Sequence, residues 1–350
     1  MGQFPLGRAA FLWESGPMLK TIGVLTSGGD SPGMNPAIRA VVRTAAAHNV
    51  TVMGINNGYD GIFDEDLTEL REDTIAHVLE RGGTMLQSSR CKRFYTAEGR
   101  QEALKKMRDS AIGGLVVIGG DGSLSGALEL HRMGFPTVGI PGSIDNDLWG
   151  TDMSVGVDTA ANTIMQLVDK IKDTARSHRR CFLVEVMGRN SGYLALATAI
   201  STGAEVAVIP EYKVNVDRVL HLLHSRFERT QGSSTIILAE GVCDADTFVK
   251  RMQESHGPNA FQQEIRKTVL GHVQRGGVPT HFDRMLAARM GELSVIGLLQ
   301  GESGVMTALK KSRLTLLDLE TVIGKKKHPA PELIRLARHL GIEFGDPVEV

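Results

Sequence analysis

Cysteine is scarce in this chain of 350 residues, and its three copies, Cys91, Cys181 and Cys243, lie far apart without a CxxC pair. This spacing argues against a disulfide framework or a structural zinc site, and it is typical of a reducing compartment. Long apolar runs are also missing, because none reaches the ~18 residues that a membrane-spanning helix needs. We therefore expect a cytoplasmic protein with no membrane partner.

An excess of one charge sign is missing too: the formal net charge is −1, with 42% hydrophobic and 23% charged residues. Without a basic field the sequence predicts no nucleic-acid partner, and any anion site must be built from local arginines. The basic run Lys325, Lys326 and Lys327 stands before His328 and two prolines. We interpret this run as a solvated connector.

Common nucleotide-binding signatures are absent as well. The chain has no GxxxxGK[ST] motif and no protein-kinase motif set, and no GxGxxG follows the first predicted strand. These absences exclude a P-loop enzyme and a protein kinase, and they argue against a dehydrogenase. Nucleotide use would have to follow a different scheme.

Apolar, β-branched runs alternate with helical patterns along most of the sequence. This βαβ order predicts mostly parallel sheets covered on both faces, and the number of units favours two α/β lobes. Strands are expected at residues 21–27, 51–55, 113–120, 136–142, 181–188, 205–211 and 234–241, with helices near 35–48, 123–133 and 191–202.

The first 17 residues do not read as a signal peptide, because they lack a continuous apolar core and contain Glu14. Met18 stands directly before the first predicted strand. We expect the native start at Met18 and a disordered leader over residues 1–17.

Glycine and polar residues follow the predicted strands in six segments: GGDSPG, GGDGS, PGSIDND, EVMGRNSG, PEY and AEGV. In open α/β sheets, ligands bind at the carboxyl ends of the strands. We therefore expect these segments to share one cleft.

The segment GGDGS, residues 119–123, places Asp121 among three glycines that let the backbone approach a phosphate. A carboxylate repels a phosphate unless a cation such as Mg²⁺ bridges them. The sequence thus predicts a metal-assisted phosphate site, although an ordinary Asp-Gly turn is the alternative. Lipid kinases and NAD kinases share GGDG, so this motif does not identify the phosphoryl acceptor.

Two further acids, Asp145 and Asp147, lie two residues apart in PGSIDND and so on one side of an extended segment. A carboxylate beside an acceptor hydroxyl can take its proton during phosphoryl transfer. An Asx-rich turn is the alternative. Basic residues near the other glycine-rich turns together suggest a phosphorylated substrate: Arg180, Arg189, Arg266, His272 and Arg275. Taken alone, each arginine is more typical of a surface salt bridge, and His272 of a packed or solvated histidine.

Taken in order, IGVLTSGGDSPGMNPAIR, VIGGDGS, PGSIDND, VEVMGRNSG, AEG and VLGHVQRGG resemble the ATP-dependent 6-phosphofructokinases of the bacterial type, from about Met18 to Leu317. The resemblance implies two Rossmann-like three-layer α/β lobes with the active site in the cleft between them. It assigns residues 18–156 plus 274–324 to a larger, ATP-binding lobe. Residues 157–273 plus 325–350 would form a smaller lobe that binds fructose 6-phosphate.

The same resemblance implies roles for individual residues. The nucleotide contacts would be Gly29, Arg90, Cys91, Gly120, Asp121, Gly122, Ser123 and Gly126, with Asp121 as the Mg²⁺ ligand. Asp145 would be the general base, and Arg189 and Gly29 would complete the catalytic set. The sugar phosphate would contact Ser143, Ile144, Asp145, Arg180, Met187, Gly188, Arg189, Glu240, Arg266, His272, Val273, Gln274 and Arg275. Arg180 and Arg266 would come from a neighbouring subunit of a homotetramer.

Gly122 and Gly142 bear on the donor, because relatives that use pyrophosphate carry aspartate and lysine there. Both glycines favour ATP over pyrophosphate. A non-catalytic paralogue is the third hypothesis, but it should have lost a residue such as Asp121, Asp145 or Arg189. Ser143 replaces a usual threonine and keeps the hydroxyl.

The family's regulatory site is matched only in part. Arg39, Arg43 and Glu205 are kept, whereas Lys172 replaces an arginine, Asp66 falls where an arginine is expected, and residues 232–235 lack an expected lysine. We expect a weak or altered response to ADP and phosphoenolpyruvate.

Overall fold

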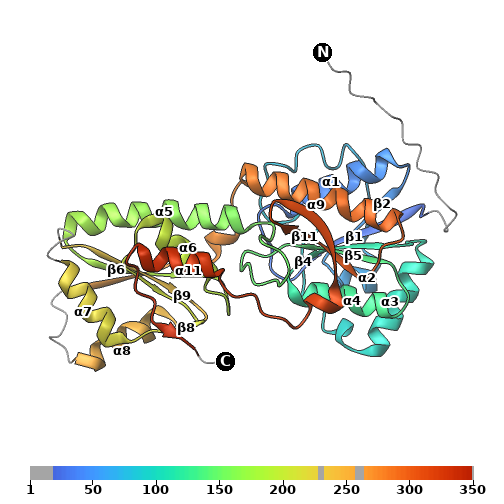
Figure 1. Ribbon diagram of the computed structural model, residues 1–350. Coiled ribbons are helices and arrows are strands. Elements are labelled where there is room, and N and C mark those ends of the chain that lie inside the picture. The colour runs from blue at the N-terminus through green and yellow to red at the C-terminus, as the bar shows by residue number, and fades with distance from the viewer. Residues whose placement is uncertain (1–18, 228–231, 257–263, 349–350) are drawn as a thin grey trace, which may run out of the picture.

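Two α/β lobes lie side by side in the computed structural model, which describes residues 19–227, 232–256 and 264–348 (Figure 1). The expected leader at 1–17 and the expected start at Met18 lie outside the described residues. The prediction of two α/β lobes with mostly parallel sheets is confirmed.

The larger lobe is built on a sheet with the strand order β12-β11-β5-β4-β1-β2-β3. The central strands pair in parallel, and the edge strands β3 and β12 pair antiparallel with β2 and β11. The strands are β1 (Thr21–Ser27), β2 (Thr51–Ile55), β3 (Leu67–Leu70), β4 (Leu115–Gly119), β5 (Thr137–Pro141), β11 (Val305–Lys310) and β12 (Arg313–Asp318).

Helices cover both faces of this sheet, which is why its central strands are apolar throughout. Val116 and Ile118 of β4 join the core beneath α1 (Met34–Ala47) and α9 (His281–Leu299). Leu115 and Val117, on the opposite face, join the core beneath α3 (Ala97–Asp109) and α4 (Asp121–Arg132). The short α2 (Asp60–Asp64) and the 3₁₀ turn η1 (Arg93–Tyr95) complete this layer.

The smaller lobe has a parallel sheet of β10-β6-β9-β7. Its strands are β6 (Cys181–Val186), β7 (Val206–Val208), β9 (Ser234–Ala239) and β10 (Ile265–Val269). One face packs against α5 (Val157–His178), α6 (Tyr193–Thr202) and α11 (Pro331–His339), and the other against α7 (Val216–Phe227) and α8 (Ala245–His256). A small ladder joins β8 (Tyr212–Lys213) to β13 (Asp346–Pro347).

The chain crosses between the lobes more than once. The turn η2 (Gly271–Arg275) leads from β10 back to α9, and α10 (Leu319–Val322) precedes a connector that returns to α11 (Figure 1). The strands therefore divide discontinuously between the lobes. The residue limits proposed from the sequence, 18–156 plus 274–324 and 157–273 plus 325–350, remain a prediction.

A buried carboxylate joins the lobes where α5 begins. Asp283 of α9 accepts hydrogen bonds from the amides of Gly156 and Thr159, at 2.9 and 2.8 Å, and from the Thr159 hydroxyl at 2.6 Å. These contacts satisfy donors at the N-terminus of α5, which a helix leaves without intrahelical partners. Across the described ranges, no helix combines the length and apolar character needed to cross a membrane.

Candidate active site

A cavity of about 390 Å³ opens at the carboxyl ends of β1, β4 and β5. Most of its lining comes from the larger lobe, and Arg189 and Asn190 reach it from the turn after β6 in the smaller lobe. The cavity thus lies between the lobes, at the strand ends where ligands of α/β proteins bind.

All of the predicted nucleotide residues line this cavity. They are Gly29, Arg90, Cys91, Gly120, Asp121, Gly122, Ser123 and Gly126. Helix α4 begins at Asp121, so the GGDGS turn presents a helix N-terminus to the cavity. A Cβ atom added at Gly122 would meet nothing within 4 Å. The cavity therefore has open space at the residue that we expect to favour ATP over pyrophosphate as the phosphoryl donor.

Gly29 is close to a cation. A Cβ atom at this position would lie 2.5 Å from Nη1 of Arg275, whose guanidinium donates to the Asp30 carbonyl at 2.8 Å. Any side chain at position 29 would push Arg275 out of its place. The glycine therefore admits an arginine to the cavity, in addition to its predicted contact with the nucleotide.

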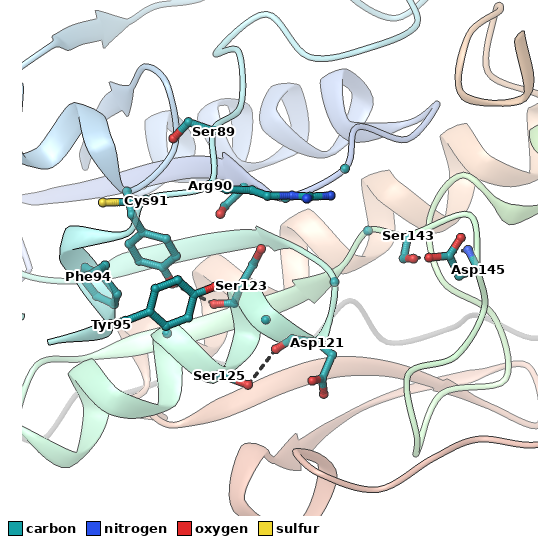
Figure 2. A pocket seen from close by; sticks show the side chains of 18 of the residues that line it. Ser89, Arg90, Cys91, Phe94, Tyr95, Asp121, Ser123, Ser125, Ser143 and Asp145 are labelled. Atoms are coloured by element: carbon teal, nitrogen blue, oxygen red, sulfur yellow. Dashed lines mark hydrogen bonds between the residues drawn. The ribbon is translucent and has the colours of Figure 1, made fainter. Parts of the chain in front are cut away.

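Asp145 lines the pocket beside Ser143, at the end away from Phe94 and Tyr95 (Figure 2). The residue is only 4% exposed, and its Oδ1 atom has no hydrogen-bond partner among the described residues. Burial, and then the charge of Asp147, raise the pKa of Asp145 to about 6, while Arg275 and Arg189 oppose the rise. A buried carboxylate with a raised pKa and a free acceptor atom has the properties of a general base.

Asp121 also lines the cavity (Figure 2). Desolvation and the nearby Asp147 raise its pKa, and a hydrogen bond from the Gly324 amide lowers it. No group of three or more His, Cys, Asp or Glu side chains that could hold a metal ion occurs in the part of the chain described. The donor set of Asp121 with Asp147 nearby therefore fits a hard cation such as Mg²⁺ only if other oxygens, such as phosphate or water, complete its shell.

The predicted sugar-phosphate residues divide into three groups. Ser143, Asp145, Arg189 and Arg275 line the cavity directly. A second group lies around the turn after β6 and the neighbouring η2: Ile144, Met187, Gly188, Glu240, His272, Val273 and Gln274. Arg180 and Arg266 form the third group, away from the cavity.

Two members of the second group, Glu240 and Gln274, support the turn that carries Arg189. Glu240 Oε1 accepts hydrogen bonds from the amides of Gly188 and Arg189, at 3.3 and 3.0 Å. Gln274 is fully buried and accepts from the Met187 amide at 3.0 Å. Direct substrate contact by this group remains a prediction.

Arg180 and Arg266 lie at the amino ends of β6 and β10, whereas the cavity is lined by residues that follow the carboxyl ends of strands. Arg180 precedes β6 and Met187 follows it, so the six residues of this strand lie between them and their seven residue steps span about 23 Å. Both arginines pair with Glu264, Arg180 at 3.0 Å and Arg266 at 2.6 Å. Neither reaches the cavity of its own chain.

Sequence reasoning missed an aromatic end of the cavity. Phe94 and Tyr95 lie in the pocket away from Asp145 (Figure 2). Tyr59 stacks on Phe94 with ring centroids 4.1 Å apart and donates to the Ser123 carbonyl at 2.8 Å. The only available signal was the stretch RFY, just after the predicted contacts Arg90 and Cys91.

Two expectations are wrong. The segment PEY does not join the shared cleft, because Glu211 instead accepts from the Gly192 amide at 2.9 and 3.1 Å and caps α6. The basic run is not a simply solvated connector either. Lys327 is half-buried and donates to Asn146 Oδ1 at 2.9 Å and to the Asp152 carbonyl at 2.8 Å.

The predicted regulatory residues have partners in the chain. Arg43 pairs with Glu72 at 2.6 Å. Lys172 donates to the carbonyl of Thr202, and Asp66 accepts from Asn56 at 2.8 Å. The expected weak effector response remains a prediction.

A two-lobed α/β fold whose inter-lobe cavity holds a helix N-terminus, several acids and arginines is typical of enzymes that transfer phosphoryl groups. The Phosphofructokinase family model matches residues 21–298, and the chain belongs to this family. Among curated relatives, the ATP-dependent 6-phosphofructokinases of Halalkalibacterium halodurans and Clostridioides difficile are each 47% identical over 324 residues. Each alignment covers 93% of this chain and 100% of the relative.

Solved structures agree with this assignment. A phosphofructokinase structure from Saccharomyces cerevisiae is 34% identical with a TM-score of 0.79, over 86% of this chain. This chain spans 45% of that longer chain. A pyrophosphate-dependent phosphofructokinase from Marinobacter aquaeolei, 21% identical, shares the fold with a TM-score of 0.80 over 95% of this chain and 94% of its own.

Proposed function

We propose that this chain transfers a phosphoryl group from MgATP to the 1-hydroxyl of D-fructose 6-phosphate. The products are fructose 1,6-bisphosphate and ADP, in the committed step of glycolysis. The observation that carries the proposal is the state of Asp145, a carboxylate that is 4% exposed and has a partnerless Oδ1 among the described residues. Names of the 47%-identical relatives support the choice of donor and acceptor.

Asp145 accepts the proton of the attacking hydroxyl at Oδ1, which raises the nucleophilicity of the sugar oxygen. Arg189 and Arg275 face the same carboxylate and favour its ionised form. Their guanidinium groups also stabilise negative charge that spreads over the phosphoryl oxygens in the transition state. The N-terminus of α4 binds donor phosphates through its free amides.

Mg²⁺ fits beside Asp121, where it would neutralise phosphate charge that otherwise repels this carboxylate. The two ends of the cavity also match the two parts of ATP, its base and its phosphates. The aromatic end at Phe94 and Tyr95 suits a nucleotide base, which pyrophosphate lacks. The open space at Gly122 leaves room for the inner phosphates.

The active assembly in this proposal is a cytoplasmic homotetramer with shared sites. Two observations support it: Arg180 and Arg266 are too far from the cavity of their own chain, and all three cysteines are free.

The test is a coupled assay of the purified protein with fructose 6-phosphate and either ATP or pyrophosphate. The proposal expects fructose 1,6-bisphosphate from ATP with Mg²⁺ and little from pyrophosphate. Turnover with pyrophosphate alone would instead support the pyrophosphate-dependent alternative. Binding of fructose 6-phosphate without turnover by either donor would support the non-catalytic paralogue.

A further inference from the structure

The connector between α10 and α11 runs along the catalytic loop. In Figure 1 it is the red segment that passes from the lobe of α4 to α11 in the other lobe. An antiparallel bridge joins Lys326 to Leu148, and this contact brings residues 324–327 against residues 145–152. The connector therefore touches the loop that carries the proposed base.

Lys327 makes the polar contacts of this connector. Its Nζ atom donates to Asn146 Oδ1 at 2.9 Å and to the Asp152 carbonyl at 2.8 Å. Asn146 is 1% exposed and lies directly between Asp145 and Asp147. Its φ of 50° is in the left-handed region, which asparagine tolerates but does not prefer. Hydrogen bonds to its side chain hold this backbone conformation in place.

The remaining partners of Asn146 are weaker. Its Oδ1 also accepts from the Ser154 amide at 3.2 Å, and its Nδ2 donates to the Asp152 carbonyl at 3.3 Å. Lys327 thus supplies the only charged donor to Asn146 among the described residues. Hydrogen bonds with a charged partner are roughly twice as strong as neutral ones.

The same connector also comes near Asp121, because the Gly324 amide lowers the pKa of this carboxylate. Lys327 itself does not line the cavity. The connector therefore contacts the loop that carries Asp145 and approaches Asp121, while Lys327 stays outside the cavity lining.

We propose that Lys327 is a positioning residue for phosphoryl transfer, which holds Asn146 and thereby aims Asp145 at the sugar hydroxyl. This inference rests on the proposed function, since its readout is the transfer reaction. A displacement of about 1 Å at a reacting group can cost on the order of 100-fold in rate. Loss of Lys327 should therefore lower kcat and leave substrate binding nearly unchanged.

The experiment compares Lys327→Met with Lys326→Met. The two variants lose the same charge from the same connector, but Lys326 is exposed and contacts the loop only through its backbone bridge. For Lys327→Met we expect kcat to fall by roughly 10- to 100-fold, with KM for both substrates within about 2-fold. Lys326→Met should match the parent protein. Equal kcat in all three proteins would overturn the inference.

A second pair of variants separates positioning from folding. Lys327→Arg keeps the charge and the donors, whereas Lys327→Gln removes the charge, so Arg should retain clearly more kcat than Gln. Equal kcat for the two would contradict the inference, even if Lys327→Met failed to fold. A double-mutant cycle with Asn146→Gly should be non-additive in kcat if Lys327 acts through Asn146. An inactive parent protein would defeat the proposed function itself, which is a different outcome from an active parent with unaffected variants.

Discussion

Nε of Arg189 lies 3.7 Å from Oδ2 of Asp145, and this contact spans the two lobes. Arg189 follows β6 of the smaller lobe, and Asp145 follows β5 of the larger lobe. The arginine side chain is 52% exposed, whereas the carboxylate is almost fully buried. A movement of one lobe against the other would therefore change the charge next to the proposed base directly.

Replacing Asp145 by asparagine removes the proton acceptor and keeps the shape of the side chain. We expect kcat to fall by about 10²- to 10⁴-fold, the usual cost of losing a general base. Fructose 6-phosphate binding, followed by calorimetry, should change little because the arginines remain. Near-parental turnover would show that another group accepts the proton.

The pH dependence of kcat should report the same carboxylate. Because only the ionised form accepts a proton, kcat should rise with pH through about 6 and level off above it. Burial and Asp147 raise this pKa, whereas Arg275 and Arg189 lower it. In Arg189→Gln the midpoint should therefore move to higher pH. The measurement is kcat at saturating substrates across the acidic and neutral pH range. An unchanged midpoint would show that Arg189 does not influence the pKa of the base.

Gly122→Asp tests the donor end of the cavity. A carboxylate there would enter open space that the donor phosphates are proposed to occupy, and like charges repel. KM for ATP should rise by at least about 10-fold, since roughly 1.4 kcal/mol of repulsion is enough for that change. Gly122→Ser is the matched control, because it adds a small side chain without charge. Similar KM values for ATP in both variants would show that the added side chain, and not its charge, weakens ATP binding.

The sequence alone was enough to predict that several strand-end motifs form one site, because this prediction depends only on local patterns. Glycines and acids that directly follow strands meet at one edge of a parallel sheet, so Gly120, Asp121 and Asp145 could be placed together before the structure was known. The antiparallel edge strands β3 and β12 carried no such polar signal and were missed.

Contacts between distant segments could not be predicted in this way. Tyr59 reaches Ser123 across 64 residues, and Lys327 reaches Asn146 across 181. The run of three lysines was interpreted as solvated because nothing in its own sequence indicates that Lys327 contacts the loop at Asn146, 181 residues away. Likewise, Glu211 follows a strand as the active-site acids do, but its side chain turns to the amide of Gly192.

Asp283→Asn should weaken the junction between the lobes. Oδ2 accepts from both the amide and the hydroxyl of Thr159, so an amide nitrogen at that position would face two donors. The free energy of unfolding should fall by about 1.5–3 kcal/mol, which is the contribution of one hydrogen bond to a charged group. Urea denaturation measures the loss. Asp109→Asn, on the exposed end of α3, is the control and should stay within about 0.5 kcal/mol of the parent protein.

Mixed oligomers test whether a neighbouring subunit supplies Arg180. The geometry requires a neighbour if this arginine binds substrate at all, because Arg180 and Met187 lie at opposite ends of β6. Arg180→Ala alone should raise KM for fructose 6-phosphate, and Asp145→Asn alone should lower kcat. Dissociating and reassociating a mixture of the two proteins should then create some sites with Asp145 from one chain and Arg180 from another. At low fructose 6-phosphate, the mixture should be more active than the average of its components. Reassociating each variant with itself is the control, and activity equal to that average, despite proven hybrid formation, would mean that each site uses residues of a single chain.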